Sequence, residues 1–164
     1  MKVEAVPKVL LDALEKKTNE LLELKTKIVE ANDKMFSDCL DYLTAVEHPF
    51  EVDLRSDAWE SYLFFDTPRH NNSGIIIHKL SFHTLITPST YNQIIEKKGY
   101  CDDVYAKFRK EVPKSILNEI KQVKSLVSEY KIKDKSVYSF CRNMNKQFNV
   151  DIKTHYEIFK AKYA

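Results

Sequence analysis

Glycine is the scarcest informative residue in this chain of 164 residues, because only Gly74 and Gly99 are present. The dinucleotide-binding loop G-x-G-x-x-G and the phosphate-binding loop G-x-x-x-x-G-K-[ST] both need several glycines. Their backbones approach phosphate groups closely and take conformations that other residues avoid. The sequence therefore excludes both of these nucleotide-binding loops.

Cysteine is also rare. Cys39, Cys101 and Cys141 are odd in number and far apart, which indicates neither a disulfide framework nor a zinc ribbon and predicts reduced thiols. Cys101 precedes an expected helix N-terminus, a position that lowers the pKa of a thiol. Asp102 and Asp103 beside it favour the neutral thiol, so we do not expect a nucleophile there.

Long apolar runs are missing as well. No stretch approaches the ~18 apolar residues that a membrane span needs. The N-terminus, Met-Lys-Val-Glu-Ala, lacks the apolar core of a signal peptide. We therefore expect a cytoplasmic protein without a membrane partner.

The net charge of +2 hides an uneven distribution. Residues 1–93 hold ten Lys/Arg and fifteen Asp/Glu, net −5, whereas residues 94–164 hold sixteen and nine, net +7. A basic half can form a surface that binds nucleic acid or an acidic protein partner. Alternatively, its lysines only cover the ordinary solvated faces of several helices. Lysine outnumbers arginine 22 to 4, which fits the codon bias of an AT-rich genome such as that of many phages.

An amphipathic run over residues 7–46 is the stretch around which the chain is organised. Its apolar residues follow a heptad pattern, in which one seam position is held by Leu14, Leu21, Ile28, Met35 and Tyr42, and the position three residues further on by Leu10, Leu24 and Ala31. Leu14, Leu21, Leu24, Ile28 and Met35 are therefore candidates for contact with a partner helix or a second copy of the chain.

The length of this helix restricts how it is used. Forty helical residues span about 60 Å, whereas a compact chain of this size has a diameter of about 40 Å. We expect a break near Asn32-Asp33, where a cap and a restart are plausible. The alternative is an unbroken arm over residues 1–48 that projects and forms a homodimer.

Residues 49–86 predict a three-stranded antiparallel meander. Phe50, Val52 and Leu54 alternate with polar residues after a proline that stops the helix. An aromatic strand over 59–65 follows, then a loop over 66–74 rich in turn formers, then a strand over 75–86. The sheet is expected to bury one face against the long helix.

Alternation within 75–86 assigns the faces of the third strand. The predicted core side holds Ile76, His78, Leu80, Phe82, Thr84 and Ile86, and the other side holds Lys79, Ser81 and His83. Trp59 and Phe64 are predicted to be buried with them. His78 is then a hydrogen-bonded core histidine rather than a catalyst.

Residues 87–164 are expected to form a basic helical part. Helices are predicted over about 88–98, ended by Gly99, over 102–111, and from Pro113 through the seam of Ile116 to Tyr130. Asp134 is predicted to cap a further helix to about residue 148, and Asp151 to cap the last one, over 152–162.

The last two helices, joined at 149–151, are either an ordinary helical hairpin or a helix-turn-helix-like pair that reads DNA. In both cases Met144, Phe148, Val150, Tyr156 and Phe159 are the predicted core. The residues expected to contact nucleic acid or an acidic partner are Arg142, Lys146, Lys153, Thr154, His155, Lys160 and Lys162.

A metal-dependent nuclease or hydrolase built on the sheet is a weaker alternative. It uses the carboxylates of Glu51, Asp53, Asp57, Glu60 and Asp66 with Lys79. Ile77 stands where such a site needs a ligand, so we predict no metal and no cofactor.

The sequence thus predicts one α+β domain over 1–164, with a long N-terminal helix, a three-stranded meander and a C-terminal helical bundle. The function expected is that of a non-enzymatic regulatory or inhibitory binding protein, such as a phage or mobile-element accessory factor. It acts on a host macromolecule through the long helix and the basic C-terminal helices. A protein partner is expected first and nucleic acid second.

Overall fold

The computed structural model describes residues 5–56, 61–67, 74–80 and 94–161, the side chains of 159–161 excepted. The contacts within the chain separate it into two compact units, and the organisation as one domain stays a prediction. We call Met1–Lys27 with Leu126–Ala164 the helical unit and Ile28–Ser125 the sheet unit. Among the residues that the structure describes, no helix combines the length and the apolar character that a membrane span needs.

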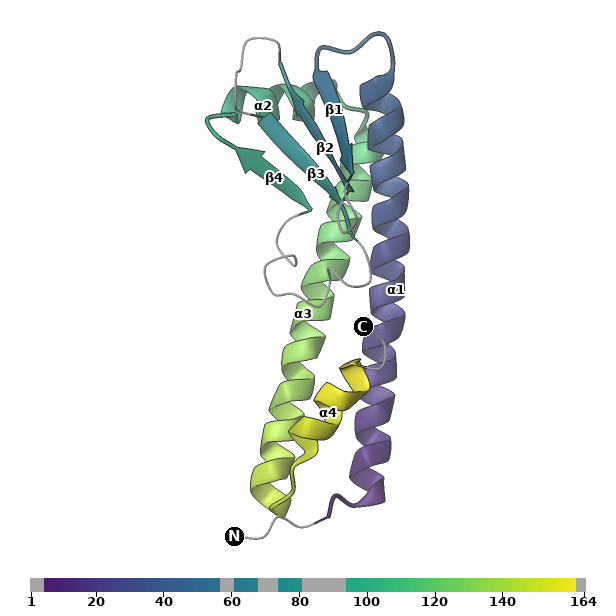
Figure 1. Cartoon of the computed structure of the whole chain (residues 1–164), viewed down its shortest axis with the longest axis vertical. Helices are drawn as coiled ribbons and strands as arrows, with labels where there is room; N and C mark the ends of the chain where they lie inside the picture. Colours follow the sequence, from purple (N-terminus) through teal and green to yellow (C-terminus); the bar gives the residue numbers. More distant parts are fainter. Residues whose placement is uncertain (1–4, 57–60, 68–73, 81–93, 162–164) are drawn as a thin grey trace. The chain divides into compact units, whose positions relative to one another are not determined.

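The N-terminal run forms one unbroken helix, α1 (Lys8–Thr44), whose two ends belong to different units (Figure 1). The predicted break near Asn32 is wrong. Asn32 caps nothing, since its side chain bonds instead to the chain around β3: Nδ2 donates to the carbonyl of His78 at 3.1 Å, and Oδ1 accepts from the Leu80 amide at 2.6 Å. A polar side chain satisfied by a remote partner leaves the helix intact.

The buried line of α1 differs from the predicted seam. Leu14, Leu21, Ile28 and Met35 are buried as expected, but the second buried position lies four residues further on and holds Thr18, Lys25, Asn32 and Cys39. Of the predicted offset-three residues, only Leu24 is buried. In a helix of 3.6 residues per turn, residues four and seven positions apart lie on the same stripe. The second line was not predicted because it holds polar residues, which the search for apolar residues passed over.

The sheet has four antiparallel strands in the order β1 (Glu51–Ser56), β2 (Ser61–Asp66), β3 (Gly74–Lys79) and β4 (Ile95–Lys98). The first three confirm the predicted meander. The helix predicted over 88–98 is wrong over its last four residues, Ile95–Lys98, which form the strand β4. Ile95 pairs there with Ile77 of β3. Gly99 follows with φ of 73°, a conformation that suits glycine and turns the chain toward the next helix.

The faces of β3 are inverted relative to the prediction. Ile75 and Ile77 are fully buried, whereas Ile76 and His78 lie half-buried on the opposite face. Three consecutive isoleucines show no alternation of apolar and polar residues, so they could not assign the faces. The prediction relied on Leu80, which is buried but lies beyond the last residue of β3. Phe82 and the rest of the predicted strand lie outside the described residues, as does Trp59.

The other strands contain two further corrections. Phe64, predicted to be buried, is only half-buried, because its neighbours Leu63 and Phe65 fill the core. Leu54 lies on the core side of the sheet, opposite Leu63, but it is 51% exposed because β1 is an edge strand.

The core of the sheet unit includes an aromatic cluster of Phe50, Phe65 and Phe108. Phe108 lies on α2 (Asp102–Glu111), which has the predicted bounds. Its ring centroid is 4.9 Å from that of Phe65 and 6.2 Å from that of Phe50. Val104, one turn earlier on α2, is buried with it. The amphipathic α2 therefore packs on the sheet face that Phe65 and Ile75 belong to.

A single helix, α3 (Lys114–Phe148), replaces the two that were predicted. Asp134 does not cap a helix, because its carboxylate accepts a hydrogen bond from the Tyr156 hydroxyl of α4 (Ile152–Ala161). The predicted cap of α4 is confirmed. Asp151 accepts bonds from the Thr154 amide at 3.3 Å and from the Thr154 hydroxyl at 2.7 Å, and these bonds hold the pKa of Asp151 below its usual value.

Candidate functional site

The helical unit contains an antiparallel hairpin of α3 and α4 (Figure 1). Asn149 turns the chain with φ of 50°, and the Ile152 amide then donates to Oδ1 of Asn145 at 2.7 Å. Further along α4, Tyr156 packs edge-on against Tyr138 of α3. Tyr138 lies one helical turn after Asp134, which accepts the hydrogen bond of the Tyr156 hydroxyl. Contacts that step backwards along α3 as α4 advances are those of a helical hairpin.

The residues predicted as the core of this pair are only partly inside. Val150 and Tyr156 are buried and Met144 is half-buried, but Phe148 is 45% exposed at the end of α3. Ile152, which was not predicted, is buried in its place. The side chain of Phe159 lies outside the described part.

Four basic residues of α3 occupy one face of the helix. Lys131, Lys135, Arg142 and Lys146 are four, seven and four residues apart, which puts them within about 60° of arc and about 22 Å of helix length. Lys153 of α4 joins them, since its Nζ lies 5.9 Å from the ring of Tyr138 on this side of α3. We call these five residues the basic face.

Carboxylates of α3 point away from the basic face. Between residues 126 and 148 the acidic residues are Glu129 and Asp134. Glu129 pairs with Lys133 at 3.3 Å, and Asp134 bonds to Tyr156. Both lie outside the arc of the basic face at 100° per residue. The positive charge of the basic face is therefore not cancelled by acids of the same helix.

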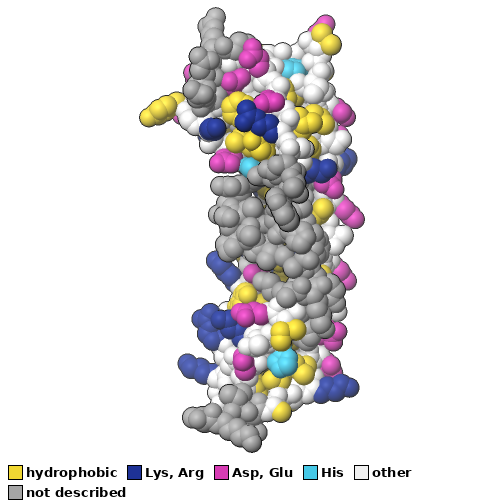
Figure 2. Space-filling model, viewed as in Figure 1, with side chains coloured by type: hydrophobic (Ala, Val, Ile, Leu, Met, Phe, Trp, Pro, Cys, Tyr) yellow, Lys and Arg dark blue, Asp and Glu magenta, His cyan; other side chains and the backbone are white. Residues whose placement is uncertain are grey.

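The basic face is open to solvent. Lys135, Arg142, Lys146 and Lys153 are exposed. Lys135, Arg142 and Lys146 form no ion pair with any residue that the structure describes. Figure 2 shows dark-blue side chains gathered along the C-terminal half of α3. Such cations can meet phosphate or carboxylate groups without first breaking an internal salt bridge.

The predicted contact residues divide into three groups. Arg142, Lys146 and Lys153 come together on the basic face. Thr154 is exposed but its hydroxyl belongs to the cap with Asp151, and His155 is half-buried. Lys162 and the side chain of Lys160 lie outside the described residues.

Sequence reasoning missed Lys131 and Lys135. The recurrence of basic residues at positions 131, 135, 142 and 146 is a helical signal, but it was divided between two predicted helices. The continuity of α3 through Asp134 unites them on one surface.

The residues predicted for self-association are all in the chain's own core. Leu14, Leu21, Leu24, Ile28 and Met35 are between 0% and 5% exposed. A partner helix could reach them only by displacing the packing within the chain. Self-association itself stays a prediction, and it needs another surface.

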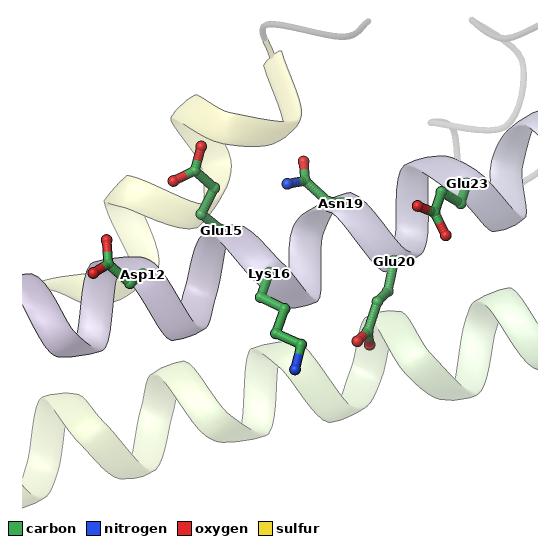
Figure 3. Close-up of a pocket in the computed structure, with 6 residues that line it drawn as sticks. All are labelled: Asp12, Glu15, Lys16, Asn19, Glu20 and Glu23. Carbon is green, nitrogen blue, oxygen red and sulfur yellow. The ribbon is translucent and has the colours of Figure 1, made fainter.

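An acidic hollow lies along α1 in the helical unit. Among the residues that the structure describes, its lining comes from α1 alone: Asp12, Glu15, Lys16, Asn19, Glu20 and Glu23. Figure 3 shows Lys16 and Glu20 extending toward α3, whereas Glu15 and Asn19 extend away from it. Because these groups spread around the helix rather than converge on one point, the hollow offers no defined ligand position.

The sheet carries one histidine–carboxylate pair. Nε2 of His78 lies 3.0 Å from Oε2 of Glu96, and the ring of Tyr62 is 6.1 Å from that of His78. Asp53 pairs with Arg55 at 2.8 Å on β1. No three His, Cys, Asp or Glu residues come together as a metal site in the described ranges, which leave out Asp57 and Glu60.

Thiol labelling tests the burial of the cysteines. Burial raises the pKa of Cys39 to about 12 and that of Cys141 to about 11, and Cys101 is also buried. At pH 8 the thiolate fraction of Cys39 and Cys141 is then about one in a thousand or less. We expect Ellman's reagent to label the native protein at least about 100-fold more slowly than the urea-unfolded protein. Fast labelling of one thiol in the native state would show that its site opens.

Comparison of the chain with models of protein families, with curated proteins and with solved structures finds no match to any of them. The candidate site therefore stands on its own geometry and charge.

Proposed function

We propose that this protein is a non-enzymatic binding protein that docks nucleic acid along the basic face of α3 and α4. The observation that carries the proposal is a line of cations, four of them exposed, without carboxylates of α3 between them. Phosphate groups repeat regularly along a nucleic-acid strand, and contacts to them give affinity without sequence preference. Binding of this kind regulates or inhibits other processes on the nucleic acid, as an accessory factor of a phage or mobile element would.

The contacts supply a definite salt dependence. Five cations that each neutralise one phosphate of duplex DNA give a slope of about −4.5 in a plot of log affinity against log salt. A fourfold rise in salt, from 50 to 200 mM, then weakens binding about 500-fold. We expect contacts to the phosphate backbone of the nucleic acid rather than to its bases, because the Thr154 hydroxyl is already bonded to Asp151 in the cap of α4.

Fluorescence anisotropy with a labelled duplex tests this proposal. The double variant Lys135→Ala with Arg142→Ala removes two contacts, so we expect its salt slope to fall by about 2 and its affinity at 50 mM salt to fall at least tenfold. The matched control is Lys133→Ala. Lys133 is an exposed lysine of the same helix, but it pairs with Glu129 off the basic face.

Two results would contradict the proposal. One is the absence of binding to duplex DNA and to single-stranded RNA at 50 mM salt. The other is an equal loss of affinity in the Lys133→Ala control. Binding to polyglutamate together with no binding to nucleic acid would instead favour an acidic protein as the partner of the basic face.

A further inference from the structure

β1 forms one edge of the four-stranded sheet. Among the residues described, no further strand pairs with it on the side away from β2. Five of its six side chains are exposed, including the large apolar Leu54. A free edge presents unpaired N–H and C=O groups that another strand can bind.

The chain's own β1 is a geometrically restricted partner for this edge. Successive residues of a strand direct their N–H and C=O groups to alternate edges. Two copies of β1 can therefore pair antiparallel only if the numbers of paired residues add to an even sum. The twofold axis then passes through one residue, which pairs with itself.

Charge selects one of these registers. An axis at position 53 puts Asp53 against Asp53, and an axis at position 55 puts Arg55 against Arg55. Like charges directly opposite one another disfavour pairing. An axis at position 54 instead puts Leu54 against Leu54 and makes two Asp53–Arg55 pairs, one on each side of the axis.

The faces of β1 agree with this register. Leu54 and its β2 partner Leu63 share the core side of the sheet, so pairing with a second Leu54 would cover exposed apolar surface beside the core. Asp53 and Arg55 share the other side, where they already form an exposed ion pair within one chain. In a dimer each carboxylate would have a guanidinium on both chains within reach.

We propose that two copies of this chain associate edge to edge through β1, with the twofold axis at Leu54, into one continuous eight-stranded antiparallel sheet. A six-residue edge buries less than a standard interface, so the dimer is expected to be weak, with dissociation on the order of micromolar or above. This surface shares no residue with the basic face or with the buried seam of α1.

Cysteine cross-linking tests the register. In the proposed dimer the two residues at position 54 face each other with Cα atoms about 5 Å apart, which suits a disulfide. Leu54→Cys should cross-link under mild oxidation. Ser56→Cys is the matched control, since it is exposed on the same side of β1 but about 13 Å from its copy. The native cysteines are buried and give little background.

Each outcome of the cross-linking decides the matter. Covalent dimer in Leu54→Cys at least tenfold faster than in Ser56→Cys supports the proposed register. Equal rates in the two variants, or no cross-link in either at 100 μM protein, overturn it.

A charge swap provides a second test. Arg55→Asp puts aspartates at positions 53 and 55 in both copies, and we expect sedimentation to show at least tenfold weaker association. Adding Asp53→Arg to that variant restores opposite charges, and dimerisation should return. If the charges of β1 serve only to block edge pairing, the natural chain will sediment as a monomer throughout, and the proposal fails. Association that is unchanged in Arg55→Asp also overturns it.

Discussion

Replacing Phe108 with alanine is expected to lower the free energy of unfolding of the sheet unit by about 3 to 5 kcal/mol. Phe108 is 1% exposed and joins α2 to the sheet through Phe65 and Phe50. Its removal leaves a cavity between a helix and a sheet, neither of which can close it without losing its other contacts. Urea unfolding followed by circular dichroism measures the effect.

Tyr100→Ala is the control for this experiment. Tyr100 is also aromatic and lies just before α2, but it is 96% exposed. We expect a change of less than about 0.5 kcal/mol, as for surface substitutions in general. A loss of under 1 kcal/mol in Phe108→Ala would show that the aromatic cluster is not the core of this unit.

Replacing Asn32 with alanine is expected to lower the free energy of unfolding by about 2 to 4 kcal/mol. Asn32 is fully buried, and both ends of its amide are bonded to the chain around β3. The variant leaves a part-buried carbonyl at His78 and a buried amide at Leu80 without this partner. Each loss is worth about 1 to 3 kcal/mol when the group is buried. The higher helix propensity of alanine returns only about half a kcal/mol.

Hydrogen exchange at the Leu80 amide gives a local readout of the same change. Its protection should fall in Asn32→Ala, whereas Asp33→Ala, an exposed neighbour on α1, should leave both protection and stability unchanged. Unaltered exchange at Leu80 in Asn32→Ala would mean that another group takes over this hydrogen bond.

Local sequence patterns determined much of the fold. The heptad of apolar residues predicted a long N-terminal helix, and the cap at Asp151 marked the start of α4. Alternation and turn formers predicted β1 to β3 and their antiparallel order. Each of these features depends on residues within a few positions of one another, so the relevant physics is contained in a short window. The basic charge of the C-terminal half was visible in the same way.

Tertiary structure alone decided the rest. Asn32 and Asp134 looked like helix caps, yet each bonds to a residue more than twenty positions away, and both helices run through them. The strand β4 exists because β3 supplies its partner backbone, which nothing between Ile95 and Lys98 reveals. Ile75 and Ile77 are buried on β3, which contacts α2, and three consecutive isoleucines show no alternation that could have assigned this face. Hydrogen bonds and packing between distant segments outweigh local preferences, so the continuous α3, and with it the full basic face, emerged only in the folded chain.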